Sequence, residues 1–562
     1  MKRFILAALV VIAAAPMWAQ TKPVSLASLI QTGNRKAALD KIRSGADVNE
    51  AQPDGTRPIH WAVYRVDYEL LDALIAKKAK VDVANEFGST PLAEAVKLAD
   101  ARMVKTLLDA GAGHESPNLD GESALMVAIK TGELPIVELL IKAGANVNVV
   151  EKFHNQTPLM YAAASAKNAG EMVKLLLSKD ASLAPRALYS DWPSQITSEP
   201  RAQYRPVGGL TALLYAARSG CYDCVEAMIG AGVNVNVPTP EGVTPLMLAI
   251  DNDHNDVARL LLDHGASPGV WDWWGRTPLY IAVDRKAASG AAGSGRGGAA
   301  GGGGRGGRGG GTPVARTSNR AAVSSMDIIN TLLAAGVDPN PELNMHRPSR
   351  GGNSGRFIEN LRSTGATPLS RAVEGGDIEV AGLLLDKGAN PNVSDMGLTP
   401  FLLAAGVGPG ARGGTGLAAQ GAVGGAANTL LMDLLLARGA DINAQVTGTK
   451  TYSMRVSRAP SANEGMTALH IAAQAGRVDL VRYLLEKGAS PEVLNSDGRK
   501  AIDLVGGAPA PPASAPVAAA AGTPATAERP GAGAPRGGTG GGAVNAASAA
   551  EIRTLLQNAA KK

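Results

Sequence analysis

The 562-residue sequence is poor in aromatic residues and cysteine, and it has no long hydrophobic run. Phe, Trp and Tyr make up only 4% of the chain, which is unusual for a globular enzyme of this size. No apolar segment approaches the roughly 20 residues that a membrane-spanning helix needs. We therefore expect a soluble mature chain that is not built like a typical catalytic domain.

Sequence motifs of common enzyme classes are also missing. The seven histidines show no His-Glu-x-x-His or other metal-ligand spacing, and no Gly-x-Ser-x-Gly nucleophile elbow occurs. The glycine-rich runs do not end in Gly-Lys-Ser/Thr, so they do not match a phosphate-binding loop. We expect a protein that is not an enzyme and that uses no metal and no cofactor.

Small and aliphatic residues are abundant instead. The chain has 68 glycines and 45% hydrophobic residues, a composition that suits small helical repeats joined by tight turns. Its length far exceeds the roughly 100 to 200 residues of a single domain. The chain is therefore either several domains or one elongated repeat array, and the composition favours the array.

A tripeptide similar to Thr-Pro-Leu recurs along the chain with a period of 33 residues. Three wider spacings, of 54, 90 and 68 residues, each fit one period plus an insertion. The copies begin at Arg57, Thr90, Ser123, Thr157, Thr211, Thr244, Thr277, Thr367, Thr399, Thr467 and Lys500. So many copies in register indicate a repeat protein.

The fixed positions of the repeat have a physical explanation. A glycine, or once Asn155, stands two residues before each Thr-like residue, as a tight turn with positive φ requires. Thr can cap the following helix, and Pro fits the first turn of that helix. A second helix carries paired leucines, so we expect Leu261 and Leu384 to be buried.

The segment Gly465-Met466-Thr467-Ala468-Leu469-His470-Ile471-Ala472 resembles the consensus pattern of the ankyrin-repeat family. The resemblance implies an all-α solenoid of about 12 antiparallel helix pairs with short β-hairpin-like fingers. It also implies binding of partner proteins through the concave face, which the fingers line. In this family, His60 and His470 would hydrogen-bond between neighbouring repeats.

The repeat positions divide the chain into segments. Residues 24–285 hold repeats 1 to 8 in part, and residues 326–505 hold repeats 8 to 12. We expect flexible insertions at the Gly/Arg-rich 287–325 and the Pro/Ala/Gly-rich 506–548. Further insertions interrupt the second array at 341–363, 406–427 and 446–463, and 549–562 should form a C-terminal capping helix.

The N-terminal segment 1–19 has the pattern of a signal peptide. Lys2 and Arg3 precede an apolar stretch at 4–15 and a short approach to cleavage before Gln20. We expect export to the periplasm or the medium, with no transmembrane segment after signal removal. An uncleaved anchor is the alternative, because Met17 stands where a small residue is usual.

Basic residues are concentrated in the insertions that enlarge the fingers, at 184–208, 341–363 and 446–463. They indicate either an acidic partner surface or decoration that improves solubility. The run 295–311 contains three arginines among glycines and is similar to an RNA-binding box, but it lacks aromatics to stack on bases. We interpret it as a flexible linker and expect no nucleic-acid partner.

The candidate partner-binding residues are mainly aromatic. Trp271, Trp273 and Trp274 lie together on the finger before repeat eight, where they either pack on neighbouring fingers or form an interface hot spot. Weaker candidates lie in the finger insertions: Tyr189, Trp192, Tyr204, Arg350, Arg356, Phe357, Tyr452 and Arg455. The partner would be an exported or envelope protein. The alternative is an acidic polymer bound by the Arg-rich loops.

Cys221 and Cys224 are the two cysteines of the chain, and they stand at the start of a second helix. We expect one to cap the helix and the other to be buried. A local disulfide and a redox-active dithiol that makes the protein a redox helper are the alternatives.

Overall fold

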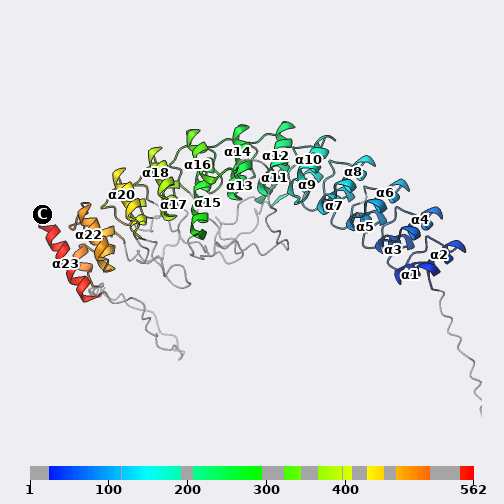
Figure 1. The fold of residues 1–562 in the computed structure, drawn as a ribbon, viewed down its shortest axis with the longest axis horizontal. Helices are drawn as coiled ribbons and strands as arrows, with labels where there is room; N and C mark the ends of the chain where they lie inside the picture. The colour runs from blue at the N-terminus through cyan, green and yellow to red at the C-terminus, as the bar shows by residue number, and fades with distance from the viewer. Residues whose placement is uncertain are drawn as a thin grey trace, which may run out of the picture. The chain divides into compact units, whose positions relative to one another are not determined.

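The computed structural model describes residues 24–115, 117–190, 207–293, 322–343, 365–394, 397–407, 427–447, 464–506 and 545–561. These residues form short helices joined by tight turns (Figure 1). They divide into two compact units, unit 1 (Met1–Leu188) and unit 2 (Tyr189–Lys562). None of the helices within these ranges is long and apolar enough to cross a bilayer.

Unit 1 is a stack of helix pairs. It contains α1 (Leu26–Gln31), α2 (Arg35–Arg43), α3 (Pro58–Tyr64), α4 (Tyr68–Ala76), α5 (Pro91–Lys97), α6 (Ala101–Asp109), α7 (Ala124–Thr131), α8 (Leu134–Lys142), α9 (Pro158–Ala164) and α10 (Ala169–Leu177). Each odd-numbered helix packs on its even-numbered successor, and α1, α3, α5 and α7 also pack on the next odd-numbered helix (Figure 1). The first helices of the pairs therefore form one layer and the second helices another.

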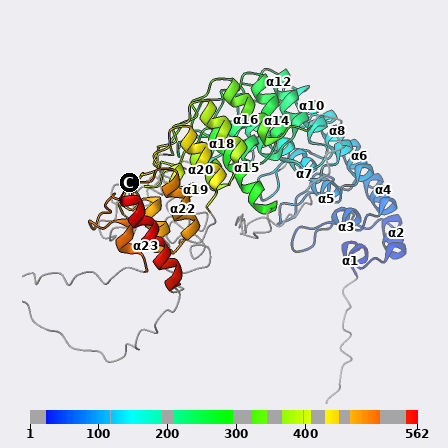
Figure 2. The same ribbon diagram turned by 60° about the vertical axis from the view of Figure 1, so that its left-hand side comes forward.

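Unit 2 repeats this arrangement. It contains β1 (Tyr189–Ser190), β2 (Val207–Gly208), α11 (Ala212–Ser219), α12 (Tyr222–Gly230), α13 (Pro245–Asp251), α14 (Asn255–Asp263), α15 (Pro278–Gly293), α16 (Ser325–Ala334), α17 (Pro368–Glu374), α18 (Ile378–Asp386), α19 (Pro400–Ala404), α20 (Thr429–Ala437), α21 (Ala468–Gln474), α22 (Val478–Glu486), the 3-10 helix η2 (Ala501–Leu504) and α23 (Ala546–Ala560). The second helices α12, α14 and α16 lie side by side (Figure 2). The strands β1 and β2 pair antiparallel, with Tyr189 opposite Gly208.

Where threonine occupies the recurring position, it caps the first helix of the pair, as the sequence predicts. Thr90 Oγ1 accepts a hydrogen bond from the Ala93 amide at 3.1 Å, and proline follows it in the first turn. The same cap forms at Thr157, Thr211, Thr244, Thr367, Thr399 and Thr467. Each cap satisfies an amide that the helix itself leaves without a partner.

The turn before each cap has the backbone conformation that the glycine pattern predicts. The glycine two residues before the Thr-like position has positive φ throughout the described repeats, for example 76° at Gly55 and 87° at Gly397. Asn155 adopts the same conformation with φ 57°. Asparagine tolerates this region better than most residues, which explains why it can replace glycine here.

The core lies between the two helices of each pair and between successive pairs. Leu261 and Leu384 are fully buried, which confirms the register of the second helix. Alanines such as Ala249 and Ala372 are also fully buried, and their small side chains let neighbouring first helices approach closely. No single repeat can bury these faces alone, so stability comes from contacts between neighbours.

Two segment boundaries differ from the predicted ones. Helix α15 continues to Gly293, into the segment 287–325 that was expected to be flexible, because alanines at 287, 288, 291 and 292 favour helix. Helix α23 begins at Ala546, before the predicted residue 549. Of the predicted insertions 341–363, 406–427, 446–463 and 506–548, most residues lie outside the described ranges, as does the segment 1–19.

Ion pairs join α15 to α17 and α18, although a long stretch of sequence separates them. Arg371 Nε donates to Asp284 Oδ1 at 2.8 Å, and Lys286 pairs with Asp377. Tyr280 of α15 packs in a buried cluster with Leu343 and Ala366. The stack within unit 2 is therefore continuous across the insertions that interrupt the sequence.

A set of asparagines that the sequence analysis passed over joins successive repeats. Asn148 Nδ2 donates to the Asp180 carbonyl at 3.1 Å, and its Oδ1 accepts from the Ser182 amide at 2.7 Å. Asn49, Asn236, Asn340 and Asn392 make the same two bonds to the following repeat. Their signal in the sequence is an Asn two residues after an Asp or Asn, just past the end of each second helix.

Candidate functional site

The finger between α14 and α15, residues 271–276, is called the Trp finger here. Trp271 is 68% exposed and Trp273 is 40% exposed, so both indoles are available to a partner. Trp274 is only 9% exposed, and the Arg276 guanidinium lies 5.0 Å from the centre of its ring. Trp274 therefore packs within the finger, which is one of the two roles that the sequence leaves open for these tryptophans.

A buried ion pair fixes the shape of the Trp finger. The Asp272 carboxylate accepts from the Trp274 amide at 3.0 Å, from the Arg276 amide at 2.9 Å and from Arg276 Nε at 2.7 Å. Arg276 also pairs with Asp251 of α13 at 3.4 Å. These bonds join Asp272 to the backbone of Trp274 and Arg276 within the same loop. The two exposed indoles are therefore attached to a fixed backbone.

The electrostatics of the pair follow from its burial. Burial raises the pKa of the Asp272 carboxyl above its ordinary value, and the Arg276 guanidinium offsets only part of that rise. Burial also acts to lower the pKa of Arg276, but the Asp272 and Asp251 carboxylates outweigh it, so this pKa is raised. A charged pair out of contact with water is costly to maintain unless it is well hydrogen-bonded, as it is here.

The Trp finger also rests on the preceding finger of unit 2. The Trp273 amide donates to the Glu241 carbonyl at 2.8 Å. A Cβ on Gly242 would lie 3.3 Å from the Trp271 carbonyl oxygen and from Asp272 Cα, which is a tight contact, and the φ of 82° at this position also favours glycine. The tip that carries the indoles is therefore held both by contacts with the preceding finger and by the Asp272–Arg276 pair within its own loop.

A second candidate surface is a hollow of about 670 Å³ in unit 1. Its lining includes Lys130 of α7, Tyr161 of α9 and the finger residues Glu122 and Glu151. The Glu122 carboxylate accepts from Lys130 Nζ at 2.7 Å and from the Tyr161 hydroxyl at 3.0 Å. Burial acts to raise the pKa of Glu122, but hydrogen bonds from Lys130, Asn118 and Tyr161 outweigh it, and the pKa is lowered.

The finger at the edge of this hollow, residues 151–156, is called the Glu151 finger here. Buried Glu151 accepts from the amides of Phe153 at 2.7 Å and Gln156 at 3.3 Å, and its Oε1 lies 3.3 Å from His154 Nδ1. Phe153 is exposed on this finger, and Leu119 is exposed on the preceding one. Paired charges beside exposed apolar tips can hold a segment of a partner protein. Within the described ranges, no group of acidic, His or Cys residues is arranged to hold a metal ion.

Family models for ankyrin repeats match most of the helical part of the chain. A model of three ankyrin repeats matches residues 26–118, 99–187, 197–272 and 213–290, and a model of one ankyrin repeat matches 364–396 and 464–496. Together these segments cover more than half of the 562 residues. The chain belongs to the ankyrin-repeat family. The predicted number of about 12 repeats stays a prediction.

Curated relatives and one solved structure are similar to parts of this chain. The E3 ubiquitin-protein ligase KEG of Arabidopsis thaliana is 25% identical over 377 residues, 64% of this chain and 19% of that protein. Ankyrin repeat and SOCS box protein 16 of Homo sapiens is 32% identical over 117 residues, 20% of this chain and 26% of that protein. The crystal structure of the human ASB11 ankyrin repeat domain matches at 24% identity and a TM-score of 0.34, over 43% of this chain and 99% of that one. The chain thus spans about a quarter or less of these two curated relatives.

The two histidines of the ankyrin motif have the structural role that the resemblance implies. His60 Nδ1 accepts from the Arg57 amide at 3.1 Å, and Nε2 donates to the Ser89 carbonyl of the next repeat at 3.2 Å. His470 does the same with Thr467 and Arg499. Burial lowers the pKa of both imidazoles, which favours the neutral form that can accept and donate at once.

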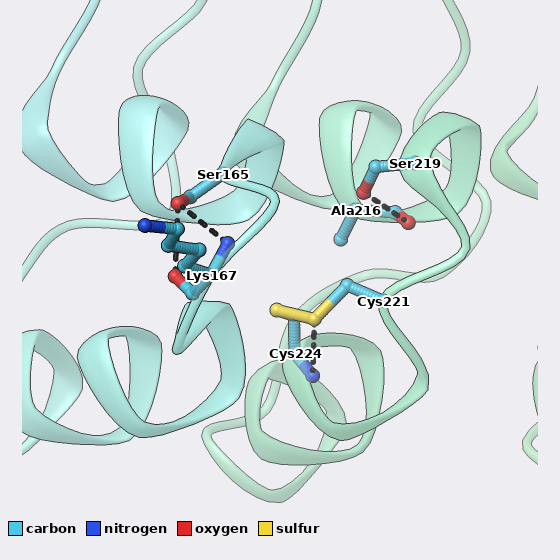
Figure 3. The surroundings of a disulfide bond; sticks show 6 residues. All are labelled: Ser165, Lys167, Ala216, Ser219, Cys221 and Cys224. Carbon is cyan, nitrogen blue, oxygen red and sulfur yellow. Dashed lines mark hydrogen bonds between the residues drawn. A yellow bond between two sulfur atoms is a disulfide. The ribbon is translucent and has the colours of Figure 1, made fainter. Parts of the chain in front are cut away.

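The cysteine pair combines two of the expected roles. Cys221 caps α12, Cys224 is fully buried, and a disulfide joins them (Figure 3). The remaining candidates for partner binding fall almost entirely outside the described residues. Tyr189 is described only as the first residue of β1, and Trp192, Tyr204, Arg350, Arg356, Phe357, Tyr452 and Arg455 lie outside the described residues, as do most of the Arg-rich loops.

Proposed function

We propose that this chain is an exported scaffold that binds a partner protein through its fingers, with the Trp finger at the centre of the contact. The single observation that carries the proposal is the pair of exposed indoles on a loop fixed by a buried Asp272–Arg276 pair. Tryptophan is enriched among the residues that contribute most to interface free energy. Such binding needs no catalytic group.

The fixed backbone of the Trp finger supports a binding role. Ordering a loop at an interface costs free energy, and a loop that is already ordered avoids that cost. Trp271 and Trp273 together present a large apolar area beside polar groups of the same finger. Isolated exposed aromatics are common on surfaces, but two neighbouring indoles held by a buried ion pair are not explained by packing of the repeat itself.

Binding is tested with Trp273→Ala and with Phe87→Ala as the matched control, because Phe87 is an exposed aromatic on another finger. The immobilised full chain captures a partner from envelope extract, the partner is identified and purified, and its affinity is measured by titration. Trp273→Ala should weaken binding by about 2 kcal/mol or more, roughly thirtyfold, and Phe87→Ala should not. Equal affinities for wild type and Trp273→Ala would contradict the proposal.

Export is proposed from the signal-like segment 1–19, and the partner is accordingly an exported or envelope protein. The test is N-terminal sequencing of the mature chain after cell fractionation. A start at Gln20 in the periplasmic fraction or the medium is expected. A chain that keeps Met1 and stays in the cytoplasm would contradict export, and it would leave the binding test unaffected.

A further inference from the structure

The Cys221–Cys224 disulfide stands where the other repeats need no covalent bond. Asp67, Asp100 and Asp377 occupy the same capping position at the start of α4, α6 and α18. Each of these carboxylates accepts a hydrogen bond from the amide three residues later. Cys221 Sγ accepts from the Cys224 amide at 3.3 Å in the same way.

This equivalence shows what the cap position favours. Three repeats place a carboxylate there, so the first turn of the helix stabilises a negative charge at this point. A thiolate on Cys221 would be the sulfur counterpart of these carboxylates. Thiolates at helix N-termini form more readily than in a free thiol, and the thiolate is the reactive form of cysteine.

The partner cysteine occupies a core position. Leu70, Met103 and Val380 stand three residues after the capping aspartates and are buried, as Cys224 is. Cys221 is only half-buried. The two residues therefore differ in access: Cys221 keeps part of its surface exposed, whereas Cys224 is shielded from an external thiol.

We expect the fold to keep its helices without this bond. The loop that it closes has only two residues between the cysteines, and short loops give the smallest loss of unfolded-state entropy. Val225 and Met228 already bury the inner face of α12, as equivalent residues do in repeats without cysteine. The cysteine pair is thus free to be reduced and reoxidised while the helix pair remains.

We propose that Cys221 and Cys224 form a thiol–disulfide exchange site, in which Cys221 is the sulfur that exchanges with an external dithiol. The dithiol belongs to a protein or a small molecule, and the site is independent of the proposed protein-binding function.

The exchange conserves atoms and electrons. A thiolate of the external dithiol attacks Cys221 Sγ, the bond to Cys224 breaks, and Cys224 leaves as a thiolate that takes a proton from water. The second thiolate of the dithiol then attacks the first sulfur of the same dithiol, which is bonded to Cys221 in the mixed disulfide. Cys221 is released as a thiolate. Two electrons have passed from the dithiol, now a disulfide, to the cysteine pair, now two thiols.

The first test uses the full-length wild type. Dithiothreitol should reduce the pair at neutral pH without denaturant, and iodoacetamide added under native conditions should label Cys221 at least tenfold more than Cys224, as peptide mass spectrometry measures. Far-UV circular dichroism should be the same before and after reduction. Resistance to reduction, equal labelling of the two cysteines, or loss of helix on reduction would overturn the proposal.

The second test uses matched variants. Cys224→Ser should form a stable mixed disulfide with thionitrobenzoate when it is mixed with Ellman's reagent, and dithiothreitol should release it. Cys221→Ser should give no adduct until the chain is unfolded. An adduct on native Cys221→Ser, or none on Cys224→Ser, would assign the bond a purely structural role. If either variant fails to fold, the labelling pattern of the reduced wild type decides.

Discussion

The Trp finger and the Glu151 finger use the same device with different electrostatics. Each has a buried carboxylate that accepts hydrogen bonds from amides of its own loop. Asp272 is compensated by Arg276, which is itself largely buried. Glu151 has the exposed His154 beside it instead, and the loop from Glu151 to Thr157 is one residue longer than the loop from Asp272 to Thr277.

The difference shows how one repeat position serves two purposes. A buried ion pair rarely stabilises a fold more than apolar residues would, but it fixes geometry because either charge alone is costly. In the Trp finger, the buried Asp272–Arg276 pair costs free energy but holds two indoles on a rigid loop. The Glu151 finger is held by backbone amides and closes one side of a hollow, where Phe153 is exposed at the tip.

The largest expected effect comes from Asp272→Ala. It leaves the Arg276 guanidinium in a buried site with only the more distant Asp251 as its acidic partner. We expect the free energy of unfolding of unit 2 to fall by about 3 kcal/mol, measured by urea unfolding followed through tryptophan fluorescence. Asp272→Asn is the control, because it keeps an acceptor for the loop amides and should lose less. A loss below 1 kcal/mol would remove the distinction between the two fingers.

Glu151→Ala should cost less, about 1 to 3 kcal/mol in the unfolding of unit 1. The loop amides of Phe153 and Gln156 lose their acceptor, but no buried cation is left behind, because His154 is exposed. Glu151→Gln keeps one acceptor oxygen and should fall between wild type and Glu151→Ala. If Glu151→Ala proved as damaging as Asp272→Ala, the two fingers would be equally dependent on charge.

Acid should loosen the fingers that follow His60 and His470. The buried imidazoles of His60 and His470 have lowered pKa values in the fold, so the native state resists their protonation. Their contribution is complete above the ordinary histidine pKa of about 6.5 and is lost as pH falls toward the lowered folded value. Met126 and Met247 take the histidine position before the Glu151 and Trp fingers.

The measurement is the melting temperature of wild type and of the double variant His60→Gln with His470→Gln between pH 7.5 and 5. The wild type should lose stability over this range, and the variant should show a flatter curve. Equal slopes for the two proteins would show that other groups carry the pH dependence.

The smallest effect on stability is expected for Trp271→Ala combined with Trp273→Ala. Both indoles are exposed, so removal should change the free energy of unfolding by no more than about 0.5 kcal/mol. Trp274→Ala is the informative contrast, since that ring is buried beside Arg276 and its loss should destabilise unit 2 measurably. A large loss for the exposed pair would make the Trp finger a packing element.

The sequence predicted the repeat in detail because each of its fixed positions has a local cause. The threonine caps, the positive φ of the turn and the bonds of His60 depend on residues within one or two repeats. The three tryptophans look alike in sequence, and only the path of the finger separates buried Trp274 from exposed Trp271 and Trp273. The pairing of Lys286 with Asp377 joins residues far apart in the chain, which no local pattern indicates.

The asparagine bonds between repeats have a consequence for how such a chain can evolve. The Asn148 side chain hydrogen-bonds to one main-chain carbonyl and one main-chain amide of the following repeat, and Asn236 does the same. Because these bonds are made to backbone atoms, this part of the joint does not depend on the side chains of the following repeat. Repeats can therefore be duplicated, deleted or exchanged without loss of these hydrogen bonds. Selection can then act on each finger tip separately.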